Sequence, residues 1–141
     1  MGSTAGNTPL PAGTASIGGL RPYPDGSTAI TAASGNVAAA TAAATLAAVA
    51  GKTTYIAGFS ISGSGATAGL PVVVTVTNTI TGTLSYIYVA VAGALLANTP
   101  IHVNFNPPIP ASAANTTIVV SCPTLGAGNT NNSAVAYGYQ I

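Results

Sequence analysis

Short runs of β-branched and aromatic residues, separated by glycine, proline and asparagine, recur from residue 53 to the end of the chain. The first run, residues 53–61, alternates with period two, and its predicted apolar face consists of Tyr55, Ala57, Phe59 and Ile61. Later runs lie at residues 72–77, 84–89, 101–105, 116–122 and 134–139. The composition of these runs and the spacing of the turns between them are typical of a β-sandwich or barrel.

The runs predict an all-β chain, an antiparallel β-sandwich of six to seven strands with jelly-roll or immunoglobulin-like connections. The turn residues Thr81 and Gly82 predict a hairpin between two of the strands. The strand at residues 101–105 is expected to end at Asn106, because the two prolines that follow cannot donate to a ladder.

Residues 37–50 fit two interpretations. Alanine, which dominates this segment, has the highest helix propensity of any residue. The large apolar residues do not recur with the helical period, however, and Thr41 and Thr45 are β-branched. Consistency with the rest of the chain favours a strand.

Residues 1–34 are rich in proline, glycine, serine and threonine and carry too few large apolar side chains to form a core. We therefore predict an extended arm at residues 1–34 and a β-sandwich domain at residues 35–141. Ordering the arm costs on the order of 1 kcal/mol per residue, so an ordered arm must lie on a neighbour or on its own domain. A disordered tail is the alternative.

Charged side chains make up only 2% of the chain, against roughly 25% in ordinary soluble domains. The complete set is Arg21, Asp25 and Lys52. Basic patches for nucleic acid and acidic sites for cations both need several like charges together, so neither is expected. A net charge near zero also weakens repulsion between copies, which predicts a homo-oligomer.

The same shortage argues against an enzyme. One Asp and no Glu leave no carboxylate pair for acid–base catalysis. His102 faces away from the apolar side of its strand, Asp25 lies in a turn sequence, and Cys122 is expected to be a buried thiol. We therefore predict no catalytic residue, no metal site and no cofactor.

Four of the six tyrosines form two pairs at positions i and i+2, Tyr86 with Tyr88 and Tyr137 with Tyr139, and the members of such a pair share one face of a strand. Such pairs could stack on a sugar, but a subunit interface or the core is favoured because acidic groups that fix sugar hydroxyls are missing. The residues predicted for an interface are Leu10, Ile17, Leu20, Tyr23, Tyr86, Tyr88, Tyr137 and Tyr139.

Four segments resemble small structural proteins of tailed bacteriophages: GKTTYIAGF at 51–59, GSGATA at 63–68, PIPAS at 108–112, and the end from GAGN at 126–129 to YGYQ at 137–140. The resemblance covers roughly residues 35–141 and is closest in kind to capsid decoration, or cement, proteins. It implies a small β-sandwich, often trimeric, whose terminal arm is laid over the shell. The implied partners are the major capsid protein or other virion proteins, and the implied location is the virion.

Two other functions remain open. A receptor- or glycan-binding module of a phage fibre or adhesin would use the tyrosine pairs. The lack of a regular threonine repeat argues against an ice- or surface-binding protein.

No membrane association is expected, because the longest apolar run, residues 86–97, is shorter than the roughly 20 residues of a membrane span. The first residues lack the features of a signal peptide, so synthesis in the host cytoplasm is expected.

Overall fold

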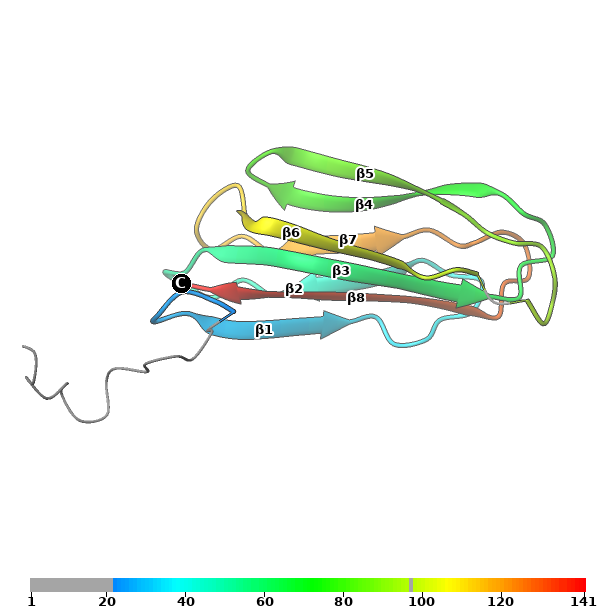
Figure 1. The fold of residues 1–141 in the computed structure, drawn as a ribbon, viewed down its shortest axis with the longest axis horizontal. Helices are drawn as coiled ribbons and strands as arrows, with labels where there is room; N and C mark the ends of the chain where they lie inside the picture. Colours follow the sequence, from blue (N-terminus) through cyan, green and yellow to red (C-terminus); the bar gives the residue numbers. More distant parts are fainter. Residues whose placement is uncertain (1–21, 97) are drawn as a thin grey trace, which may run out of the picture.

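A computed structural model describes residues 22–96 and 98–141, which form two facing antiparallel sheets (Figure 1). Sheet A has the order β1-β8-β3-β6 and contains β1 (Thr28–Ala33), β8 (Asn131–Gln140), β3 (Thr54–Ser64) and β6 (Ile101–Pro110). Sheet B has the order β2-β7-β4-β5 and contains β2 (Ala42–Leu46), β7 (Ile118–Cys122), β4 (Pro71–Thr79) and β5 (Gly82–Val89). The predicted all-β sandwich is confirmed, with eight strands in place of six to seven.

The first strand lies inside the segment assigned to the arm. β1 pairs with β8, with Ile30 opposite Gly138, and Ile30 and Ala32 pack against the core. The sandwich therefore includes residues from Thr28 onward, and not only those from residue 35. The predicted interface residues Leu10, Ile17 and Leu20 lie outside the described residues.

The alanine-rich segment contains β2, which confirms the strand interpretation over Ala42–Leu46. The inner face of β2 carries Ala42 and Ala44, and β8 presents Ala134 and Ala136 to the core. Cα atoms of β2 and β8 come within 8 Å of each other, closer than the usual spacing of about 10 Å between packed sheets. Methyl side chains at these four positions suit this close approach, and the third inward residue of β2, Leu46, is also buried.

Larger side chains fill the other side of the sandwich. The ring of Phe59 meets that of Tyr86 edge to face, with centroids 5.1 Å apart, and lies 6.1 Å from that of Phe105. On β4, Val74 and Val76 face inward and are fully buried. The sandwich is therefore packed by methyl groups on one side and by aromatic rings on the other.

Two local predictions were wrong. A β-bulge between Ile56 and Gly58 breaks the alternation of β3, so Ile56 faces the core and Tyr55 faces outward beside Tyr139. In addition, β6 does not end at Asn106 but continues to Pro110. Its prolines are tolerated because β6 is an edge strand of sheet A.

Candidate functional site

Four connections gather at the end of the sandwich opposite the C terminus (Figure 1). This loop end consists of residues 34–41, 65–70, 90–96 with 98–100, and 123–130. Main-chain hydrogen bonds join its loops: Thr67 N–H donates to Ala127 O (3.1 Å), and Gly93 N–H donates to Ala66 O (2.7 Å). The loop end is thus a connected surface.

A buried amide holds two of these loops to β8. Asn132, which is fully buried, directs Nδ2 at the carbonyl oxygens of Ala40 (3.1 Å), Cys122 (3.2 Å) and Pro123 (3.0 Å). Its main chain exchanges two hydrogen bonds of 2.9 Å with Val37. A single side chain therefore links the β1–β2 loop, the end of β7 and the start of β8.

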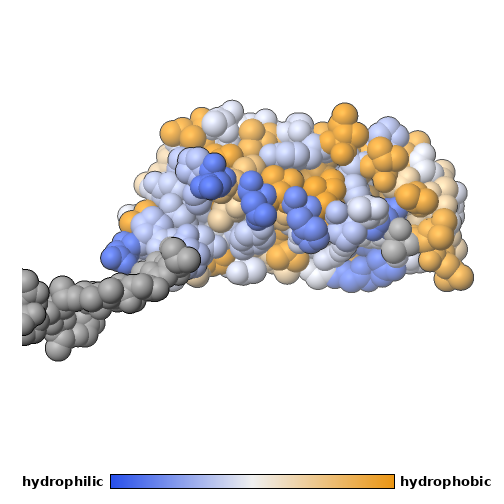
Figure 2. All heavy atoms as spheres, in the orientation of Figure 1, coloured by the Kyte–Doolittle hydropathy of each residue, from blue (hydrophilic) through white to orange (hydrophobic). Residues whose placement is uncertain are grey.

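Large apolar side chains are exposed along β4 and β5 and on the loop end beside them. Leu95 is 98% exposed, Ile87 74% and Val89 61%. We define the apolar patch as Leu70, Val73, Ile87, Val89, Val91, Leu95 and Leu96. Figure 2 shows hydrophobic residues gathered over β4 and β5 and at the loop end, and hydrophilic residues in a row over β6.

The patch brings together two segments of the chain. Val73 lies opposite Ile87 in the β4–β5 ladder, and Ala90 N–H donates to Leu70 O (3.2 Å). A fully exposed side chain of this size presents roughly 100 Å² of apolar surface. Scaled by their exposed fractions, the side chains of the patch together present an apolar area on the order of 400 Å². That area matches the apolar share of the roughly 800 Å² that each partner buries in a standard protein interface.

No charged side chain belongs to the patch. Lys52 lies near the start of β1, where Nζ donates to the Thr28 hydroxyl (3.3 Å), and Asp25 lies in the turn just before β1. The start of β1 is at the end of the molecule opposite the loop end (Figure 1). The patch is therefore a neutral apolar surface, suited to packing against another apolar surface.

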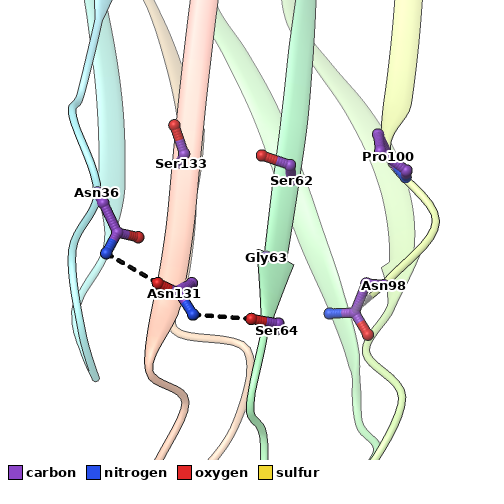
Figure 3. Close-up of a pocket in the computed structure, with 8 residues that line it drawn as sticks. All are labelled: Asn36, Ser62, Gly63, Ser64, Asn98, Pro100, Asn131 and Ser133. Atoms are coloured by element: carbon purple, nitrogen blue, oxygen red, sulfur yellow. Dashed lines mark hydrogen bonds between the residues drawn. The ribbon is translucent and has the colours of Figure 1, made fainter. Parts of the chain in front are cut away.

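The outward face of sheet A has a different character. A pocket of about 240 Å³ at its loop-end margin is lined by Asn36, Ser62, Gly63, Ser64, Asn98, Pro100, Asn131 and Ser133 (Figure 3). Asn131 spans this margin, because it accepts a hydrogen bond from Asn36 (2.9 Å) and donates one to the Ser64 hydroxyl (2.8 Å). The lining residues carry amides and hydroxyls and no charged group, and most of the exposed lining is apolar.

Of the tyrosines predicted to form an interface, one pair lies in the core and the other lies on the outward face of sheet A. Tyr88 is buried and Tyr86 is half-buried against Phe59, so this pair belongs to the core. Burial raises the pKa of Tyr88, the charge of Cys122 raises it further, and the amide of Asn98 lowers it. Neither residue forms an exposed ledge.

The second pair lies on the outward face of sheet A. The ring of Tyr139 stacks on that of Tyr55, with centroids 4.7 Å apart, and lies 5.0 Å from the ring of Tyr23, so Tyr139 is buried. Tyr137 donates a hydrogen bond across Gly58 to Asn104, in the space that a side chain at Gly58 would occupy. Tyr23, Tyr55 and Tyr139 thus hold the segment before β1 against sheet A.

The residues considered for chemistry are not brought together. His102 is exposed on β6, Cys122 is buried in β7, and Asp25 lies in the turn before β1. Within residues 22–96 and 98–141, no group of three or more His, Cys, Asp or Glu side chains is arranged to hold a metal ion. The predicted burial of Cys122 is confirmed.

The Cys122 thiol makes stability depend on pH. Burial raises its pKa to about 11, and the Asn132 side chain lowers it in part. Because the folded pKa exceeds the ordinary value of about 9, the stabilisation is complete below pH 9 and is lost as the pH rises through 11. We expect the wild type to lose on the order of 2 kcal/mol of unfolding free energy across this interval.

Urea unfolding in a reducing buffer at pH 8 and at pH 11 measures this loss. Cys122→Ala is the reference, because it retains Tyr86, Tyr88 and Tyr139, whose pKa values are also raised by burial. The loss should be smaller in Cys122→Ala than in the wild type. Equal losses in the two proteins would contradict the assignment to the thiol.

The sequence patterns did not predict the apolar patch, although residues 86–97 are the longest apolar run of the chain. No helix long and apolar enough to cross a membrane occurs in the part of the chain that the structure describes.

Comparisons with protein-family models, curated proteins and solved structures found no match to this chain.

Proposed function

We propose that this chain is a structural protein of a bacteriophage virion, a capsid decoration protein that stabilises the shell by packing its apolar patch against other virion proteins. The observation that carries the proposal is the neutral apolar surface formed by the patch on the loop end and on β5. Water contact with such a surface is unfavourable, and a protein partner removes that contact. The resemblance in residues 35–141 supports the same function and implies the major capsid protein or other virion proteins as the partner.

The strand order supports a jelly-roll type of sandwich within this proposal. Neighbouring strands of both sheets are mostly far apart in sequence, as in β1-β8-β3-β6 and β2-β7-β4-β5, and β4–β5 is the hairpin between consecutive strands. Jelly rolls consist of eight strands in two sheets and occur in viral capsid and lectin domains. An immunoglobulin-like constant domain has seven strands in a different order.

Particles purified from a culture that carries this sequence test the proposal. We expect mass spectrometry to find the chain in the particles, and cryo-electron microscopy to place its loop end against the shell. The full chain with Leu95→Asp and Leu96→Asp should rebind at least tenfold more weakly to particles from which the chain has been removed, because two charges would be desolvated at the contact.

Ile80→Asp is the matched control, since Ile80 is 64% exposed but lies in the β4–β5 turn, at the end opposite the loop end. This variant should rebind like the wild type. Absence of the chain from the particles would overturn the proposal. Equal binding by the Leu95 and Leu96 variant would overturn the role of the patch.

The alternative function, a receptor- or glycan-binding module, is supported by the pocket of sheet A. Its amides and hydroxyls can exchange hydrogen bonds with the hydroxyls of a neutral sugar. The tyrosine pairs do not support it, because Tyr88 and Tyr139 are buried. A glycan array with the wild type and Asn131→Ala tests this alternative: binding that the substitution removes favours it, and no binding by the wild type rejects it.

A further inference from the structure

Strand β5 forms an open edge of sheet B, because the order β2-β7-β4-β5 places it at the end of the sheet. Antiparallel pairs alternate between hydrogen-bonded and non-hydrogen-bonded, and the hydrogen bond from Ala90 N–H to Leu70 O fixes this alternation for β5. The residues whose backbone groups point toward β4 are then Leu84, Tyr86 and Tyr88. Those whose N–H and C=O groups point to the open edge are Ser85, Ile87 and Val89.

The other edge strands carry features that oppose pairing with another chain. β6 contains Pro107 and Pro108, β2 has five residues, and β1 begins beside the Lys52 ammonium group. By contrast, β5 has the sequence GTLSYIYV, with no proline and no charge. An exposed apolar edge of this kind pairs readily with another strand unless it is protected.

We infer that β5 pairs antiparallel with β5 of a second copy about a twofold axis near Ile87, which joins sheet B of both copies into one continuous sheet. Ile87 and Val89 have backbone groups that point to the open edge, and their apolar side chains are exposed. Pairing with a second β5 gives these backbone groups hydrogen-bond partners and places an apolar neighbour beside each side chain. A twofold interface of this kind is self-complementary, since each copy presents the same strand to the other.

The lack of charge and the apolar character of the edge favour a second copy as the partner. The chain has a net charge of +1, and no charged residue lies in β5 or in the patch, so two copies approach without local repulsion. Ile87 and Val89, the exposed apolar residues of this edge, would each lie beside an apolar residue of the second copy across the new ladder. The pairing predicts a dimer in place of the trimer that the resemblance implies.

This inference rests on the proposed function only in that both use the patch as a packing surface. The dimer uses Ile87 and Val89 on β5, whereas binding to the particle is tested through Leu95 and Leu96 on the loop end. A failure of one test therefore leaves the other unaffected. Dimerisation is measured on the purified full chain without particles.

Analytical ultracentrifugation of the full chain over a range of concentrations measures the dimer. Ile87→Lys should weaken dimerisation about tenfold, because it replaces an apolar contact across the twofold axis with two like charges side by side. Ser85→Pro should have a similar effect while the fold is kept, because the N–H that proline removes points to the open edge. Ile80→Lys, at the β4–β5 turn, is the matched control and should dimerise like the wild type.

A cross-link tests the register. Cα atoms of a hydrogen-bonded antiparallel pair are about 5.5 Å apart, within the range of a disulfide. Ile87→Cys should therefore form a covalent dimer on oxidation, and Ile80→Cys should not; the native Cys122 is buried.

Three results would overturn the inference. One is a wild type that stays monomeric at every concentration. Another is a dimer unaffected by both Ile87→Lys and Ser85→Pro. The third is a dimer that is lost when residues 1–21 are deleted and is unaffected by Ile87→Lys, which would identify that segment as the occupant.

Discussion

Gly138→Ala should destabilise the fold by about 3 kcal/mol or more, a large part of the 5–15 kcal/mol typical of a domain. Gly138 lies opposite Ile56, at the β-bulge of β3. A Cβ atom at this position would overlap the carbonyl oxygen of Tyr55 and would lie 2.9 Å from its carbon and 3.1 Å from the Cα of Ile56. These are main-chain atoms, so no change of rotamer relieves the overlap and β3 must move away from β8.

Urea unfolding followed by circular dichroism measures the effect. Ser133→Ala, on the outward face of the same strand, is the control and should change the unfolding free energy by no more than about 0.5 kcal/mol. If Gly138→Ala unfolded at the urea concentration of the wild type, the close approach of β3 and β8 at the bulge would be wrong.

Much of the fold follows from local patterns in the sequence. The runs predicted at residues 72–77, 84–89 and 116–122 overlap β4, β5 and β7, because β-branched residues between turn signals need no distant information to be recognised. The bulge in β3 could not be predicted from such local patterns. It depends on how two neighbouring strands pair with β3, and period-two alternation within one strand carries no sign of this pairing.

The first strand was missed for a related reason. β1 contains one large apolar residue, Ile30, and follows a segment rich in proline and glycine. Its place in the sheet comes from a main-chain ladder with β8, the last strand of the chain. This pairing joins the first and last strands, which are about 100 residues apart in sequence, and the residues of neither strand alone indicate it.

The candidate site was the least predictable part. Tyrosine pairs mark a shared face of a strand but not which face is buried, and in β5 it is the face of Tyr86 and Tyr88 that turns inward. The outward face then carries Ile87 and Val89, which read in the sequence as ordinary strand residues. Exposure of Leu95 and Leu96 likewise depends on how four loops meet at one end of the sandwich.

Asn132→Asp should strongly destabilise the fold. The introduced carboxylate would be fully buried and surrounded by the carbonyl oxygens of Ala40, Cys122 and Pro123, which now accept from the Asn132 amide. Leaving a buried charge uncompensated costs on the order of 3–5 kcal/mol. We therefore expect the variant to be largely unfolded at pH 7, or to unfold at a much lower urea concentration than the wild type.

The pH dependence separates this charge effect from a general loss of packing. Burial among carbonyl oxygens raises the folded pKa of the introduced carboxyl above its ordinary value of about 3.9. The charge penalty is therefore absent below that pH and grows as the pH rises toward the folded pKa, so the deficit relative to wild type should shrink between pH 7 and pH 3.5. Asn131→Asp, which adds the same charge at an exposed neighbouring position, is the control and should show a small effect. A deficit that stayed constant with pH would mean that Asn132 acts through its shape, and that its hydrogen bonds to the loops contribute little to the stability of the loop end.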